Sequence, residues 1–305
     1  MSPALEAFLN PILPVSAILI LGFIFGRAGT FTAAEATPIN RFVFYLAVPA
    51  LLFNIMADAP LETFDWALLL AYFISECGIY AGAAAIARFV FKRGPRESLL
   101  LGMAACFSNH VFFVLPMARI LYGDQAALPI GAIIVVDSIG LFGFTMAGLE
   151  IASNTGRSLA RIPLVLARNP VLAAMALGLA VNIAGIPVHD GIRTFTNFTG
   201  ASAAPVALFA LGVILSNAGI GRLDGAALMA AASKVILHPL LGYTLFMNVF
   251  DIEPAWSEPA LLVTAGPCGA MPFVLALQYG VKSEGVAKAM IYSSVASLAV
   301  MSIIA

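Results

Sequence analysis

The chain has 305 residues, of which 61% are hydrophobic and only 10% charged, and its formal net charge is −1. A soluble domain has about 25% charged residues, so this composition excludes a soluble globular protein and predicts an integral membrane protein. The three cysteines fall in apolar runs without zinc-like spacing, so we expect neither a disulfide nor a metal site. We find no nucleic-acid signature and expect no nucleic-acid partner.

Apolar stretches long enough to cross a bilayer, about 20 residues each, follow one another along the whole chain. We number them spans 1 to 10, and they cover residues 5–27, 38–57, 66–90, 97–122, 126–150, 163–186, 194–217, 226–250, 257–280 and 284–304. The predicted organisation is a first five-helix repeat (1–151), a cytoplasmic connector (152–162) and a second five-helix repeat (163–305) in one membrane domain. Because five is odd, the second repeat enters the membrane from the opposite side, which makes the repeat inverted.

The spacing of prolines supports two halves of common origin. Three pairs of prolines share an offset of 156 residues: Pro14 with Pro170, Pro49 with Pro205, and Pro116 with Pro272. The second pair lies in similar local sequences. Paired, interrupted hydrophobic segments in two halves point to the binding site of a transporter.

Spans 4 and 9 are the interrupted pair. Span 4 has Asn109 and His110 at its centre, followed by Pro116, and span 9 has Pro267, Gly269 and Pro272 in mid-span. A proline removes a helical hydrogen bond, and in hydrocarbon the freed backbone groups need partners. We therefore predict an all-α membrane protein in which helix 4, near Asn109–Pro116, and helix 9 are broken.

The basic residues predict the orientation. Twelve Lys and Arg residues lie on the side that holds the connector, and Arg193 alone lies on the other side. Cytoplasmic loops are enriched in Lys and Arg. We therefore expect a protein of the bacterial inner membrane with both termini on the periplasmic side.

Central charges mark candidate coupling residues. Glu76 in span 3 lies near the bilayer centre, and Lys234 lies at nearly the matching position of span 8. Intramembrane ionisable groups are functional candidates by default, so both are expected at a coupling or support site and could face each other. Asp137 is either a site residue or a structural polar group. His110 is either a proton carrier or a hydrogen-bond partner of the broken backbone.

The runs Asn40–Phe53, Asn109–Pro116 and Pro267–Val274, followed by Gln278–Val281, resemble the auxin efflux carrier family. That family includes plant PIN-type carriers and bacterial permeases of the malonate type. The resemblance covers essentially the whole chain, without a long central cytoplasmic loop. It implies a crossed-helix fold, a scaffold of helices 1, 2, 6 and 7, a moving unit of helices 3–5 and 8–10, carboxylate-type substrates and a homodimer.

The resemblance also assigns site positions. It matches Asn109, Pro116, Pro267 and Pro272 to the two breaks and Glu76 to the support site. Two positions depart from the family pattern: Tyr80 stands where plant carriers often have a basic residue, and His110 replaces a small polar residue. The full set of candidate substrate-binding residues is Asn54, Asn109, His110, Pro116, Asp137, Pro267, Cys268, Gly269 and Pro272.

The sequence thus predicts a secondary transporter for a small organic anion, a mono- or dicarboxylate, that works by alternating access without a cofactor. Its partners would be the substrate, membrane lipid and a second copy of the chain, and its coupling ion would be H⁺ or Na⁺. The first alternative is a sodium-coupled symporter of the bile-acid type, and the second is an intramembrane hydrolase. No paired-aspartate, serine–histidine or metal-ligand spacing supports the hydrolase, so no enzyme activity is expected. A channel or ligand sensor is a third class.

Overall fold

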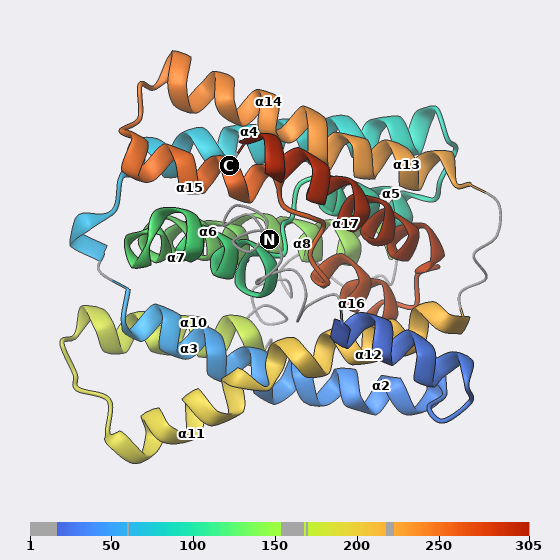
Figure 1. Cartoon of the computed structure of the whole chain (residues 1–305), viewed down its shortest axis with the longest axis horizontal. Helices are drawn as coiled ribbons and strands as arrows, with labels where there is room; N and C mark the ends of the chain where they lie inside the picture. The colour runs from blue at the N-terminus through green and yellow to red at the C-terminus, as the bar shows by residue number, and fades with distance from the viewer. Residues whose placement is uncertain (1–16, 60, 154–167, 169, 218–222, 305) are drawn as a thin grey trace, which may run out of the picture. The chain divides into compact units, whose positions relative to one another are not determined.

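The computed structural model describes residues 17–59, 61–153, 168, 170–217 and 223–304 (Figure 1). Most of the predicted connector and the first residues of predicted spans 1 and 6 lie outside these residues. The described part is nearly all helical and contains a single isolated β-bridge. Five described helices are long and apolar enough to span a membrane: Ala33–Ala57, Trp66–Phe89, Ala127–Ala152, Asp190–Ile214 and Gly225–Val249.

The chain divides into two compact units, each built from separated segments. Unit 1 comprises Met1–Leu9, Thr63–Arg157 and Gly221–Ala305, and unit 2 comprises Asn10–Glu62 and Ser158–Ile220. Residues from both halves of the sequence therefore meet inside each unit.

Unit 2 is a small helical bundle. Its described helices are Ala17–Arg27, α2 (Ala33–Phe42), η1 (Val43–Ala47), α3 (Val48–Ala57), α10 (Pro170–Ile183), α11 (Asp190–Ala201) and α12 (Ala203–Asn217). Helices α10 and α11 both pack against α3, and α12 packs against α2. A Cβ atom on Gly178 of α10 would lie 2.5 Å from the carbonyl oxygen of Phe53, so glycine permits this close helix contact.

Unit 1 holds the remaining helices. Its first segment forms α4 (Trp66–Phe89), α5 (Pro95–Ala104), η3 (His110–Val114), α6 (Leu115–Tyr122), η4 (Asp124–Ala126), α7 (Ala127–Val136), η5 (Asp137–Leu141) and α8 (Phe142–Ala152). Its second segment forms α13 (Gly225–Ala232), η7 (Ser233–Leu237), α14 (His238–Tyr243), η8 (Thr244–Val249), α15 (Pro254–Ala265), α16 (Met271–Gln278) and α17 (Glu284–Ile304). The short turn η2 (Leu61–Thr63) precedes α4.

Several of these helices contain widened π-helical turns, and three of the turns have a common cause. Pro49, Pro116 and Pro239 each stand two residues after the end of a π segment, namely η1, η3 and η7. A proline lacks an N–H group, and its ring clashes with the carbonyl four residues back. A widened turn moves that carbonyl away, so the helix continues past the proline.

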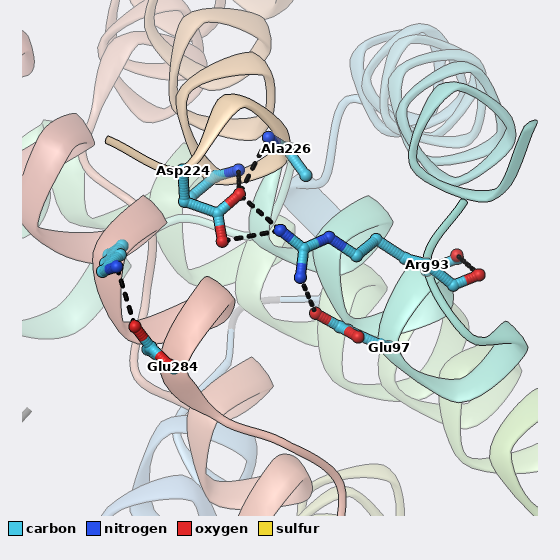
Figure 2. A network of polar contacts seen from close by, with 8 residues as sticks. Arg93, Glu97, Asp224, Ala226 and Glu284 are labelled. Carbon is cyan, nitrogen blue, oxygen red and sulfur yellow. Dashed lines mark hydrogen bonds and ion pairs between the residues drawn. The ribbon is translucent and has the colours of Figure 1, made fainter. Parts of the chain in front are cut away.

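A polar network ties the two segments of unit 1 together near the start of α13 (Figure 2). The Arg93 guanidinium donates to both carboxylate oxygens of Asp224, at 2.7 and 2.8 Å, and to Glu97 at 3.1 Å. Asp224 also caps α13, because it accepts from the backbone N–H groups of Ala226 and Ala227. The same carboxylate therefore serves as helix cap and as ion-pair partner.

Candidate functional site

Two helices of unit 1 are interrupted. The first stops when α5 ends at Ala104 and resumes at His110 with η3, which continues directly into α6. The second stops when α15 ends at Ala265 and resumes at Met271 with α16. The sequence places the first break near Asn109–Pro116, whereas the non-helical residues lie just before His110.

Pro116 lies inside the resumed helix, not in the gap. It stands in the first turn of α6 behind the widened turn η3, and Pro272 similarly stands in the first turn of α16. For Pro272 this position costs little, because the missing N–H would have had no partner within a helix that begins at Met271. Pro116 lies six residues after the restart at His110, where the widened turn η3 accommodates it. Neither proline lies in a gap.

The two gaps pair with each other through their backbones. Ser108 and Cys268 form an antiparallel bridge, in which the Asn109 N–H donates to the Pro267 carbonyl and the Gly269 N–H donates to the Phe107 carbonyl, both at 2.9 Å. Backbone groups freed by a break in a membrane helix must be satisfied inside the protein. Each break here supplies the partners that the other one needs. We call this paired structure, residues 107–109 with 267–269, the crossing.

Glycine is required where the segments touch. A Cβ atom on Gly269 would lie 2.6 Å from the Ser108 carbonyl oxygen, and one on Gly266 would lie 2.5 Å from a methyl carbon of Val114. Real Cβ atoms do not approach backbone oxygens this closely, so any larger residue at position 269 forces the two segments apart.

Two side chains hold the end of α15 next to the crossing. The ammonium group of Lys234 donates to the carbonyl oxygens of Val263, at 3.2 Å, and Thr264. The Ser108 hydroxyl, from the other break, donates to the Val263 carbonyl as well. The last carbonyls of a helix lack intrahelical partners and carry partial negative charge, so a buried cation is well placed there.

A cluster of buried ionisable side chains lies beside the crossing. The His110 Nε2 atom lies 2.6 Å from the Asp137 Oδ2 atom, and the Tyr72 hydroxyl donates to the same oxygen at 3.2 Å. The Glu76 carboxyl group is close enough to that of Asp137 for a side-chain hydrogen bond between them. Glu76, Asp137 and His110 are 0%, 1% and 5% exposed.

The sequence suggests that Glu76 and Lys234 could face each other, but the structure does not pair their charges. Both side chains are fully buried in unit 1, but among the described residues no ion pair joins them, and Lys234 donates to α15 instead. Neither carboxylate oxygen of Glu76 has a hydrogen-bond donor in the described part of the chain. The carboxyl partner of Glu76 is Asp137, which sequence spacing does not indicate.

His238 lies next to two residues of α4, Ser75 and Tyr72. Its Nε2 atom is 3.3 Å from the Ser75 hydroxyl, and its ring lies 5.9 Å from that of Tyr72 between centroids. The ring is fully buried, and its Nδ1 atom has no partner among the described residues.

Three of the charged or titratable residues occupy widened turns. His110 begins η3, Asp137 begins η5 and Lys234 is the second residue of η7. Short π segments within α-helices often mark functional sites. The π-helical segment η5, which begins at Asp137, is not followed by a proline, unlike η3 and η7. Of the three segments, it is therefore the strongest indication of a functional site.

The remaining predicted site residues divide between the units. Cys268 is buried in the crossing, and its N–H donates to the Ser293 hydroxyl oxygen at 3.0 Å. Asn109 is half-buried, and its side chain forms no hydrogen bond with another described residue. Asn54 belongs to unit 2, where it donates to Asn197 and accepts from Thr196, both at 2.7 Å.

Sequence reasoning missed Tyr72, Ser75 and Ser293. Tyr72 is four residues before Glu76, so the two face the same side of one helix, and this spacing could have indicated Tyr72. The two serines lie in apolar spans and are a common residue type without a distinguishing pattern. Ser108 stands beside Asn109 at the polar centre of span 4, but its contact with α15 could not be predicted from the sequence. Among the described residues, no group of three or more His, Cys, Asp or Glu is arranged to hold a metal ion.

Comparisons with known proteins agree with a membrane protein of this kind. A family described as "Membrane transport protein" matches residues 7–160 and 153–305. The chain is 25% identical to the "Putative malonate transporter" of Rhizobium meliloti over 94% of this chain and 92% of that protein. It is 23% identical to an "Uncharacterized transporter" of Methanothermobacter thermautotrophicus over 94% of each chain. It is also 24% identical to the "Lysosomal cholesterol signaling protein" of Mus musculus, over 93% of this chain but 35% of that protein.

Proposed function

Because the chain belongs to the Membrane transport protein family, which matches it along essentially its whole length, we propose that it is a secondary transporter for a small organic anion, a mono- or dicarboxylate. The match confirms the resemblance to auxin efflux carriers, and membership in this family makes the chain a transmembrane protein. The relative named as a malonate transporter supports a carboxylate substrate. The proposal includes no enzymatic step.

The observation that carries this proposal is the crossing. Two interrupted helices from opposite halves of the sequence pair their backbones within one unit, and helices restart beside the pair at His110 and Met271. The first N–H groups of a helix lack intrahelical partners and attract anions. Asn109, at the first restart, offers a side-chain amide with no described partner, which suits a substrate carboxylate.

The architecture we propose has ten transmembrane helices in two inverted five-helix repeats. The described helices of unit 2 come from predicted spans 1, 2, 6 and 7, and those of unit 1 come from spans 3–5 and 8–10. This division supports a scaffold formed by unit 2 and a moving unit formed by unit 1, which carries the crossing between the two sides of the membrane. We further propose an inner-membrane location with periplasmic termini, and a homodimer.

The sodium-coupled bile-acid-type symporter is the weaker alternative. No described side chain contact favours it over the organic-anion carrier, and the family and its relatives support the carrier. Sodium dependence of uptake separates the two.

The test is uptake of radiolabelled organic acids, beginning with malonate, into liposomes that contain the purified protein. We expect saturable uptake that competes with other small carboxylates, and loss of uptake in Asn109→Leu with normal expression and a monodisperse elution profile. Asn248→Leu, a change of the same chemistry at an exposed position of η8, is the control. Wild-type liposomes that take up none of the acids tested, or an Asn109→Leu variant with wild-type rates, would contradict the proposal.

A further inference from the structure

The buried cluster beside the crossing contains two carboxyl groups, Glu76 and Asp137. If both were ionised, no cation among the described residues in contact with them would balance the two negative charges. Glu76 and Asp137 are both carboxylic acids with almost no exposure. Lys234, a fully buried cation of the unit, already donates to the carbonyls of Val263 and Thr264. Burying an unpaired charge is so costly that a group gives up its charge instead. Two adjacent buried carboxyl groups therefore favour a state with one proton between them.

The pattern of unsatisfied atoms identifies where the proton belongs. When both acids are ionised, Glu76 Oε1, Glu76 Oε2 and Asp137 Oδ1 have no donor among the described residues. No hydrogen bond joins the two carboxyl groups in the described structure, and one can form only if one of the acids is protonated. A protonated Glu76 can donate to Asp137, whose Oδ2 atom already accepts from Tyr72. One proton thus satisfies oxygens on both acids.

His110 provides the next position for that proton. Its Nε2 atom lies 2.6 Å from Asp137 Oδ2 but is not aligned for a hydrogen bond in this structure. A small rotation of the ring would bring the nitrogen into line with this carboxyl oxygen.

Several other titratable groups lie near the pair. They are Tyr72 and Cys77 on α4, Cys106 in the first break, His110 at the start of η3, Lys234 on η7, and His238 of α14, which lies next to Tyr72 and Ser75. Of these, His110 is the group with a nitrogen within hydrogen-bond distance of a carboxyl oxygen of the pair. The route for a proton is therefore Glu76, Asp137, His110.

We infer that the coupling ion is a proton, held between the carboxyl groups of Glu76 and Asp137 and exchanged with His110 beside the crossing. In the transfer, the O–H bond of the carboxylic acid breaks, a new N–H bond forms at His110 Nε2, and the acid becomes a carboxylate. No electrons are exchanged, and the total charge of the three groups does not change. The inference rests on the proposed transport function, but the proton site itself is measurable without any substrate.

The first experiment measures the proton directly by infrared difference spectroscopy of the purified protein from pH 5 to pH 8, without ligand. Protonated carboxyl groups in apolar surroundings have a characteristic C=O stretching band that is absent from carboxylates. We expect this band in the wild type at neutral pH and its loss in Glu76→Gln. The conservative change Glu76→Asp should retain it. Glu150→Gln is the control, since Glu150 lies on α8 outside the cluster and accepts from Tyr279.

The second experiment imposes a proton gradient or a sodium gradient on liposomes that contain the protein, with malonate as the probe. We expect the proton gradient alone to drive accumulation in the wild type, and we expect the accumulation to be lost in Glu76→Gln and Asp137→Asn. His110→Gln should slow it several-fold and flatten its pH profile. Folding of each variant is checked by its elution profile and its amide infrared bands.

The outcomes separate this inference from the proposed function. If no organic acid is taken up by the wild type, the proposed function fails, whereas the infrared band still decides whether the proton site exists. If the wild type transports malonate but is driven by sodium, or if the protonated carboxyl band is missing or survives in Glu76→Gln, the proton inference is overturned and the transport proposal stands.

Discussion

The ammonium group of Lys234 lies 3.2 Å from the carbonyl oxygen of Val263, at the C-terminus of α15. A hydrogen bond from a charged donor contributes about 1.5–3 kcal/mol. We therefore expect Lys234→Met to lower the free energy of unfolding of the purified protein by an amount in this range. Transport should also be impaired, because the last carbonyl groups of α15, beside the crossing, lose their hydrogen-bond donor. Thermal unfolding in detergent, followed by tryptophan fluorescence, measures the effect.

A double-mutant cycle distinguishes this role from an ion pair with Glu76. If Lys234 acts on α15, the effects of Lys234→Met and Glu76→Gln on stability should be nearly additive. If Glu76→Gln instead restores the stability of Lys234→Met, the two charges are partners, and the role of helix cap is wrong.

The crossing predicts unequal effects for two glycine-to-alanine changes. In Gly269→Ala the new Cβ atom would lie 2.6 Å from the Ser108 carbonyl, whereas nothing lies within 4 Å of a Cβ atom on Gly82. Overpacking of this kind costs about 1–3 kcal/mol and separates the paired segments. Malonate uptake should therefore fall sharply in Gly269→Ala and stay near the wild-type rate in Gly82→Ala. Equal rates in the two variants would show that the close pairing is dispensable.

The two roles of Asp224 can be separated by substitution. Asparagine keeps the oxygen that accepts from Ala226 and Ala227 but loses the charge that binds Arg93. Asp224→Asn should lower stability by about 0.2–1 kcal/mol, the usual range for a partly exposed ion pair, and the difference should shrink in high salt. Asp224→Ala should cost about 1 kcal/mol more, because the cap is lost as well. Thermal unfolding of both variants at low and high salt tests this, and equal losses in the two would contradict a separate capping role.

The distribution of basic residues predicts the orientation of the chain. With twelve Lys and Arg on one side and one on the other, a C-terminal alkaline phosphatase fusion in a bacterial host should be active, and a C-terminal green fluorescent protein fusion should be dark. The reverse pattern would overturn the orientation. Opposite locations for the two termini, obtained with N-terminal reporters, would contradict an even number of spans.

Much of the helical pattern could be predicted from hydrophobic length alone. Helix α4 covers Trp66–Phe89 where residues 66–90 are predicted, and α17 covers Glu284–Ile304 as predicted. The interruptions could be predicted because a proline in mid-span removes a helical hydrogen bond and the freed backbone groups need partners in the membrane. Their exact place could not, because it depends on backbone pairing between residues 160 positions apart, Ser108 and Cys268, and no local pattern encodes such pairing.

The partners of the buried charges could not be predicted for a related reason. The offset between the halves brings Lys234 near the position that matches Glu76, yet it does not fix which way either side chain points. Asp137 and Glu76 come from different helices, and their contact follows from how α4 packs against α7 and η5. Helix packing at this level depends on many small contacts rather than on any one residue.

The dependence of each break on the other has a consequence for biosynthesis. Residues 107–109 are made and inserted long before residues 267–269, and the Cys268 N–H finds its partner only when Ser293 has been added. During that interval the amide of Asn109 and the carbonyl of Phe107 have no native partner, and hydrocarbon supplies none. These backbone groups of the first break therefore need water or the insertion machinery as partners until residues 267–269 have been synthesised. A chain that stops before residue 267 should be recognised by the cell as unfinished and degraded, although most of its helices have already been made.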